Sequence, residues 1–205
     1  MTILVTGFSA FPGAPINPTA DLAASFDGGS TAGGEAVRGV VLPVEWEGSW
    51  PRLRAAIEAS APRVVLMFAL QAGLTGLRVE LTARNRRELG RPDAVGAFPS
   101  GPAVADGPER FAVRLPLTDA ATALRAAREP FDWSGDAGRY LGNDTFYKLA
   151  MNADRLAVER FGFLHVPLTD DLVDAWNTAG VLPSPCTTLA ADRLRSAARA
   201  LIEVL

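Results

Sequence analysis

The sequence Val64-Val65-Leu66-Met67-Phe68 is an uninterrupted apolar run. A strand with one face in water alternates between polar and apolar residues, whereas a strand of a parallel sheet is covered on both faces and reads as a continuous apolar stretch. The residues that cover it are usually those of helices. The run therefore predicts the interior of a parallel sheet in an α/β protein.

Short apolar runs alternate with helical patterns on both sides of this stretch, as expected for a sheet with helices on both faces. We predict strands at Ile3–Thr6, Val37–Pro43, Val64–Ala69, Leu77–Thr82 and Gly162–Val166. We predict helices at Pro18–Phe26, Gly48–Ser60, Asp119–Arg128, Leu141–Arg160 and Thr187–Leu205. The expected architecture is a single α/β domain over residues 1–205, with a central, twisted, mostly parallel sheet.

Length and composition agree with this expectation. The chain has 205 residues, 48% of them hydrophobic, and a formal net charge of -3. A chain of this length buries about 70% of the surface that its unfolded state exposes, so its core can stabilise it without cross-links. The acidic balance and the scattered arginines lack the concentrated basic face that neutralises phosphates. We therefore expect a globular protein that does not bind nucleic acid.

The chain has one cysteine, Cys186, and one histidine, His165. A disulfide within the chain is therefore excluded, and so is a structural zinc site made of cysteine and histidine ligands. The glycines of Gly7–Gly13 lack the Lys-Ser/Thr of a phosphate-binding P-loop and the spacing of a dinucleotide fingerprint. We expect no metal and no cofactor.

The amino-terminal residues Met1–Gly7 show neither the basic nor the long apolar segment of a signal peptide. No apolar run reaches the roughly 18 to 20 residues of a membrane-spanning helix. A lone cysteine fits a reducing compartment. We expect a cytoplasmic protein with no membrane partner.

Several groups of residues match one enzyme family in the order in which they occur along the chain. They are Gly7–Gly13 with Asn17-Pro18-Thr19, Val41–Val44, Gln71–Gly73 with Val79-Glu80 and Asn85, Gly107-Pro108 with Leu115-Pro116, Ser134 with Ala137-Gly138, Leu141–Asn143 with Tyr147, and Gly162–Pro167. The ordered set resembles pyroglutamyl peptidase I, the pyrrolidone carboxyl peptidases, over nearly the whole chain. The resemblance implies a phosphorylase/hydrolase-like α/β fold and assembly into dimers or tetramers.

The resemblance also implies a cytosolic cysteine peptidase that removes an N-terminal pyroglutamyl residue (5-oxoproline) with a Glu-Cys-His triad. The matching positions here are Glu80, Gly142 and His165. A thiol at a helix N-terminus has a lowered pKa, and a histidine can accept its proton and later protonate the leaving amine. Glycine has no side chain, so the atom that would attack the substrate carbonyl is missing at position 142.

A pocket for the pyrrolidone ring is implied by the same resemblance. Phe8 and Phe11 match the aromatic pair that sandwiches the ring. Tyr140 and Leu141 match a further apolar wall, and Gln71 is a candidate polar group. Aromatic faces suit a flat lactam, which a few polar groups then orient. Taken without the resemblance, Phe8 and Phe11 also fit ordinary core packing.

An oxyanion site is implied at the start of the helix expected from Leu141. The backbone N–H groups of Gly142 and Asn143 can face a carbonyl oxygen or an anion. The family arginine that assists them aligns with Gly90, and Arg91 follows directly. We therefore name Arg91 and Gly142 as the oxyanion candidates.

The role of Glu80 has two interpretations. A buried carboxylate is costly without a partner, and His165 would supply one. Arg84 or Arg87 would supply a different one. A pair of Glu80 and His165 is therefore compatible with a structural as well as a catalytic role.

Three functions remain open. The first is a pyroglutamyl-peptidase homologue with little or no turnover, which still binds N-terminal pyroglutamyl peptides or 5-oxoproline. The second is an active hydrolase, either because the natural residue at position 142 is cysteine or because another group, such as Cys186 or Ser9, replaces it. The third is a non-catalytic oligomeric scaffold. We expect a homo-oligomer in each case.

Overall fold

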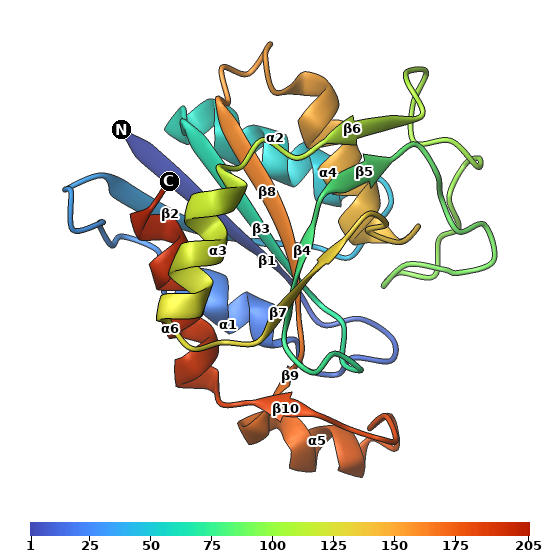
Figure 1. Ribbon diagram of the computed structural model, residues 1–205. Coiled ribbons are helices and arrows are strands. Elements are labelled where there is room, and N and C mark those ends of the chain that lie inside the picture. Colours follow the sequence, from blue (N-terminus) through green and yellow to red (C-terminus); the bar gives the residue numbers. More distant parts are fainter.

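A central six-stranded sheet dominates the computed structural model, which describes residues 1–205 (Figure 1). The strand order is β2-β1-β3-β8-β4-β7. The strands are β1 (Thr2–Phe8), β2 (Ala36–Leu42), β3 (Val64–Leu70), β4 (Leu77–Glu80), β7 (Phe131–Ser134) and β8 (Arg160–Val166). Strands β2, β1, β3 and β8 are parallel, whereas β4 is antiparallel to β8 and parallel to β7. The prediction of a mostly parallel sheet is confirmed.

Helices cover both faces of the sheet (Figure 1). On one face, α2 (Ser49–Ser60) and α4 (Leu141–Asn152) share a hydrophobic cluster with Val65 and Met67 of β3. On the other, α1 (Pro18–Ala24), α3 (Leu117–Ala126) and α6 (Ala191–Glu203) share a cluster with the alternate residues Leu66 and Phe68. The central strand is thus buried on both faces, which explains its unbroken apolar sequence.

The predicted strand Leu77–Thr82 is wrong beyond Glu80. Strand β4 ends there, and β5 (Thr82–Arg84) leaves the sheet to pair with β6 (Arg110–Ala112). The side chain of Asn143 in α4 forms hydrogen bonds with the backbone N–H and carbonyl of Arg84, which hold this segment against the helix. A long-range contact of this kind leaves no pattern in the local sequence.

Two predicted helices have wrong ends. The helix predicted at Leu141–Arg160 ends at Asn152, and Arg160 already begins β8. Ala157 between them has a φ of 54°, outside the range of a right-handed helix. The helix predicted from Thr187 starts at Ala191, because the preceding residues form β10 (Thr188–Leu189) beside β9 (Leu168–Thr169).

The sequence did not predict β6, β7, β9, β10, the 3₁₀ turn at Asp170–Leu172 or α5 (Val173–Thr178). None of these elements is longer than six residues. Such segments are too short to show a helical or strand period. Their conformations follow from their partners in the folded chain.

The end of β1 is fixed against the start of α1. Asn17 caps α1 by accepting a hydrogen bond from Thr19 N, and Pro18 occupies the first turn. Thr19 Oγ1 in turn accepts a bond from Phe8 N at 2.9 Å. A Cβ atom on Gly7 would overlap the Thr19 carbonyl, so only glycine permits this approach. The arrangement places Phe8 at the edge of the sheet where the other parallel strands also end.

Two further findings concern the whole chain. None of its helices combines the length and the apolar character that crossing a membrane requires. No group of three or more His, Cys, Asp or Glu side chains is arranged to hold a metal ion.

Candidate functional site

Glu80 and His165 meet between the neighbouring strands β4 and β8. The strands are antiparallel, and Glu80 lies opposite Phe163, two residues before His165. The two side chains therefore lie on the same face of the sheet. His165 Nδ1 is 2.7 Å from Glu80 Oε1, and Glu80 is only 1% exposed. The hydrogen bond gives the buried carboxylate a partner and orients the imidazole ring.

The arginines that the sequence offered as alternative partners of Glu80 are engaged elsewhere. Arg84 donates to a backbone carbonyl, and Arg87 forms a buried ion pair with Asp144 at 2.7 Å. The interpretation in which either arginine neutralises Glu80 is therefore wrong. Glu80 Oε2 has no hydrogen-bond partner in the chain, so His165 is the only residue that the carboxylate contacts through a hydrogen bond.

Gly142 is the second residue of α4, and its neighbour Asn143 fixes the start of this helix. Asn143 Oδ1 accepts a hydrogen bond from Arg84 N at 2.9 Å. Its Nδ2 donates to the carbonyl oxygens of Arg84 and Arg86 at 2.9 and 3.1 Å. The first N–H groups of an α-helix have no partner within the helix, so this anchored turn presents backbone donors at a defined place.

A cavity of about 60 Å³ joins the start of α4 to His165. Its lining consists of Phe8, Phe11, Asn17, Val44, Ala69, Leu70, Tyr140, Leu141, Gly142 and His165. The structure thus brings four of the predicted binding residues together with Gly142 and His165. The fifth, Gln71, is exposed and is not part of the lining.

Sequence reasoning missed four lining residues, Asn17, Val44, Ala69 and Leu70. Ala69 and Leu70 end β3, and Val44 comes shortly after β2. The carboxyl ends of parallel strands meet at one edge of a sheet, which is where open α/β sheets bind ligands. The predicted ends of these strands could therefore have indicated Val44, Ala69 and Leu70 as lining residues, but not Asn17.

The family model for pyroglutamyl peptidase matches residues 1–204. The chain belongs to the pyroglutamyl peptidase family. A pyrrolidone-carboxylate peptidase of Streptomyces coelicolor is 34% identical over 183 residues, which cover 88% of this chain and 84% of that protein. One of Vibrio campbellii is 31% identical over 202 residues, which cover 98% of this chain and 92% of that protein.

Solved structures of the family agree with the fold. A pyrrolidone carboxyl peptidase from the hyperthermophile Pyrococcus furiosus is similar with a TM-score of 0.90 and 27% sequence identity. The match covers 100% of this chain and 97% of that one. The predicted α/β fold and the predicted resemblance to the pyroglutamyl peptidase family are both confirmed.

Phe163 fills the space next to Gly142 in this member of the family. A Cβ atom on Gly142 would lie 2.6 Å from Phe163 Cζ, well inside normal contact distance. The Phe163 ring is fully buried, and its centroid lies 4.6 Å from that of His165 and 5.4 Å from that of Phe146. Any side chain at position 142 therefore requires this ring to move.

Arg91 lies at the rim of the small cavity. Its guanidinium carbon is 3.8 Å from the ring centroid of Tyr140 and 5.9 Å from that of Phe11. The Tyr140 hydroxyl donates to the carbonyl of Pro92 at 2.9 Å, which ties the Arg91 segment to the cavity wall. Burial raises the pKa of the Tyr140 hydroxyl, because desolvation disfavours the phenolate. Arg91 thus stacks on the aromatic wall and is exposed to solvent.

Cys186 and Ser9, the two side chains considered as alternative nucleophiles, do not line the cavity that contains His165. Cys186 packs at the margin of a separate hydrophobic cluster around Trp176. The Ser9 hydroxyl donates to the adjacent Ala10 carbonyl. Neither side chain shares the cavity in which His165 would act as its base.

Proposed function

We propose that this member of the pyroglutamyl peptidase family binds 5-oxoproline, or the N-terminal pyroglutamyl group of a peptide, with little or no turnover. The observation that carries this proposal is the contact of Gly142 and Phe163. Glycine supplies no attacking atom, and the Phe163 ring occupies the adjacent space. Covalent catalysis requires a side-chain nucleophile at this point, and no other candidate lines the cavity.

The cavity retains features that suit a lactam. Phe8, Phe11 and Tyr140 provide aromatic surface for a flat, mostly apolar ring. His165 and the backbone N–H groups at the start of α4 provide polar contacts for the ring amide and for the carbonyl that follows it. A mainly apolar site with a few convergent polar groups is typical of small-molecule binding.

Without a nucleophile, hydrolysis would require direct attack by water, with His165 as the base. Glu80 would still orient His165 and stabilise its protonated form, as the third group of a triad does. Enzymes that lose a triad nucleophile retain a rate on the order of 10³ to 10⁴ over the reaction in water. We expect such a rate to be undetectable in a conventional peptidase assay.

Two measurements on the unmodified protein test the proposal. Calorimetric titration with 5-oxoprolinamide is expected to show binding, and a chromogenic pyroglutamyl anilide is expected to release no product. Absence of heat at high millimolar ligand would contradict the binding function. Clear release, abolished by a thiol reagent, would contradict the loss of turnover and would implicate Cys186.

The hydrogen bond between Glu80 and His165 favours a second candidate, a cysteine peptidase whose position 142 is naturally cysteine. The distance of 2.7 Å between His165 Nδ1 and Glu80 Oε1 suits a pair in which the Glu80 carboxylate orients His165 as the base. Gly142→Cys, with Gly142→Ser as the matched control, tests it by release from the anilide. Release of product by Gly142→Cys but not by Gly142→Ser would support this candidate. A folded Gly142→Cys variant that releases no product would exclude it.

The third candidate, a non-catalytic scaffold, requires a homo-oligomer without a ligand. Assembly into a dimer or tetramer is part of each candidate and is measured by analytical ultracentrifugation. An oligomer that binds neither 5-oxoprolinamide nor pyroglutamyl peptides would favour the scaffold over the first two candidates.

A further inference from the structure

Arg91 carries a positive charge that no acidic side chain of the protein balances. The other three arginines of the segment Arg84–Arg91 form ion pairs with Asp136, Glu109 and Asp144. The carboxylate of Asp93, two residues after Arg91, is buried and accepts hydrogen bonds from the backbone N–H groups of Trp46, Val95 and Ala97. Arg91 therefore has a free charge and free N–H donors at the rim of the small cavity.

Aromatic rings of the cavity wall hold the Arg91 guanidinium group in place. Its carbon atom lies 3.8 Å from the ring centroid of Tyr140 and 5.9 Å from that of Phe11. Both rings line the small cavity. A planar guanidinium group over an aromatic face directs its N–H groups past the edge of the ring, where they remain available to a ligand.

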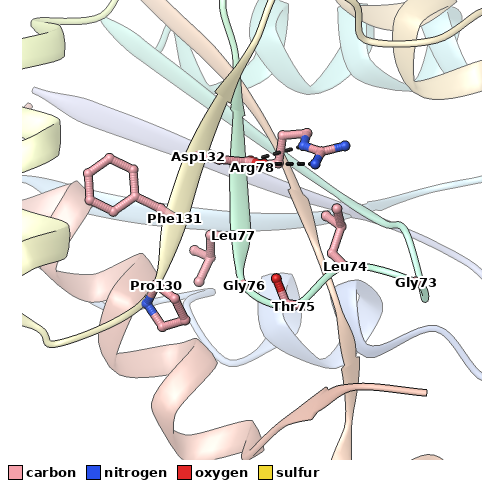
Figure 2. A pocket seen from close by; sticks show the side chains of 9 residues that line it. All are labelled: Gly73, Leu74, Thr75, Gly76, Leu77, Arg78, Pro130, Phe131 and Asp132. Atoms are coloured by element: carbon pink, nitrogen blue, oxygen red, sulfur yellow. Dashed lines mark hydrogen bonds and ion pairs between the residues drawn. The ribbon is translucent and has the colours of Figure 1, made fainter. Parts of the chain in front are cut away.

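Arg78, the arginine nearest to His165 in the sheet, offers no such charge. It lies opposite His165 in the register of β4 and β8. Its Nε and Nη2 donate to Asp132 Oδ1 and Oδ2 at 2.9 and 2.7 Å, the dashed lines in Figure 2. This bidentate pair balances both charges. The pair also lines a different cavity, of about 340 Å³.

The wall of the small cavity contains no group that would repel an anion. None of its lining residues is Asp or Glu, and Glu80 is buried and bonded to His165. Tyr140 directly precedes α4, and no side chain caps the first N–H groups of this helix. Free N–H groups at the start of a helix favour negative charge. The cavity is therefore better suited to an anionic ligand than to a neutral one.

We propose that Arg91 makes the small cavity selective for free 5-oxoproline, as its carboxylate, over the amide-linked pyroglutamyl group of a peptide. The inference rests on the proposed function, since the lactam ring must occupy this cavity. The carboxylate is bonded directly to the ring, so a ring that rests on Tyr140 and Phe11 places it beside the guanidinium group stacked on the same side chains. Charge-assisted hydrogen bonds from Arg91 to the carboxylate are stronger than bonds to a neutral amide carbonyl.

Calorimetry at neutral pH with two probes, 5-oxoproline and the neutral 5-oxoprolinamide, tests the inference. We expect the acid to bind the unmodified protein about tenfold more tightly than the amide. Methionine retains apolar contact with Tyr140 but has no charge. Arg91→Met should therefore weaken binding of the acid about tenfold and binding of the amide by less than about threefold.

Arg125→Met is the matched control. Arg125 in α3 also stacks over an aromatic ring, that of Phe131 at 5.8 Å, and it does not line the small cavity. We expect this variant to keep the full preference for the acid. A preference lost equally in both variants would show that the net charge of the protein causes it, which would overturn the role of Arg91.

The outcomes separate the inference from the proposed function. Equal affinities for the two probes, or a preference that survives in Arg91→Met, would overturn the inference while binding of the amide sustains the proposed function. Absence of binding by either probe would overturn both. If Arg91→Met loses both ligands, Arg91→Lys decides, because it keeps a positive charge at this position. A preference for the acid in Arg91→Lys would support the inference, and any other result with this variant would refute it.

Discussion

At the scale of single residues, the Phe163 ring occupies the space that a side chain at position 142 would need. The Cβ atom of any other residue at position 142 would meet Phe163 Cζ at 2.6 Å, and the ring is held by His165 and Phe146. Overpacking of a buried site costs about 1 to 3 kcal/mol. We expect Gly142→Ala to lower the free energy of unfolding by this amount, measured by urea denaturation.

A second substitution tests whether contact with Phe163 causes the loss of stability in Gly142→Ala. Phe163→Leu shortens the reach of this side chain toward position 142, so the cost of Gly142→Ala should shrink in that background. The two changes form a double-mutant cycle, and residues in contact give coupling energies of about 0.5 to 3 kcal/mol. Additive costs would show that the overlap is relieved by other parts of the chain.

We expect two tyrosine hydroxyls to contribute most to the response of this protein to alkaline pH, since the chain has only two tyrosines, one cysteine and one lysine. Burial raises the pKa of the Tyr147 hydroxyl, and the negative charge of Asp106 adds to this effect. Burial also raises the pKa of Tyr140. A group whose pKa is higher in the folded state stabilises the fold below its unfolded pKa, here about 10. That contribution is lost as the pH rises through the folded pKa.

We therefore expect the free energy of unfolding to fall above about pH 10 and to fall less steeply in Tyr147→Phe. At neutral pH the same variant should lose about 1 kcal/mol, because the Tyr147 hydroxyl donates to the Pro108 carbonyl at 2.7 Å. Urea denaturation at stepped pH measures both effects, and absorbance at alkaline pH reports the titration. An unchanged slope in Tyr147→Phe would refute the assignment.

At the scale of elements, the start of α4 depends on one buried side chain. Asn143 makes three hydrogen bonds to the backbone of Arg84, the last residue of β5, and of Arg86. Asn143→Ala leaves these groups without partners, which should cost about 2 to 4 kcal/mol of stability. We also expect weaker binding of 5-oxoprolinamide, because the first turn of α4 lines the cavity.

Asn152→Ala is the control for this prediction. Asn152 lies at the other end of α4 and donates a single hydrogen bond to the Lys148 carbonyl. Its loss should cost about 1 kcal/mol or less and leave ligand binding unchanged. Thermal unfolding and calorimetry measure both variants. Equal costs at Asn143 and Asn152 would mean that the contact with β5 does not hold α4 in place.

The helices and strands differ in how far the local sequence predicts them. Strands β1, β2, β3 and β8 and the starts of α1, α2 and α4 were predicted within one or two residues, because each has a local apolar pattern or a local cap. The split of β4 from β5 and the short strand β7 were not predicted. Both depend on neighbours that are distant in the chain, Asn143 for β5 and the register with β4 for β7.

At the scale of the whole molecule, the sheet separates two hydrophobic clusters. Leu66 contacts one cluster and Met67 the other, and both residues are fully buried. Leu66→Ala and Met67→Ala should each lower the free energy of unfolding by about 2 to 5 kcal/mol. Urea denaturation measures both, with the exposed Arg38→Ala on edge strand β2 as a control. A small cost at either core position would show that one face of β3 is not closely packed.

The sequence by itself determined the fold class and indicated part of the candidate site, but it missed the lining residues Asn17, Val44, Ala69 and Leu70. Apolar periodicity and helix caps are local properties, and the ordered motifs place Glu80, Gly142 and His165 in a family. Only the tertiary structure decided that Glu80 pairs with His165 rather than with an arginine, and that Phe163 fills the space beside Gly142. It also decided that Arg78 lies opposite His165 in the register of β4 and β8. The physical reason is strand register, which brings together side chains separated by 85 positions in the chain.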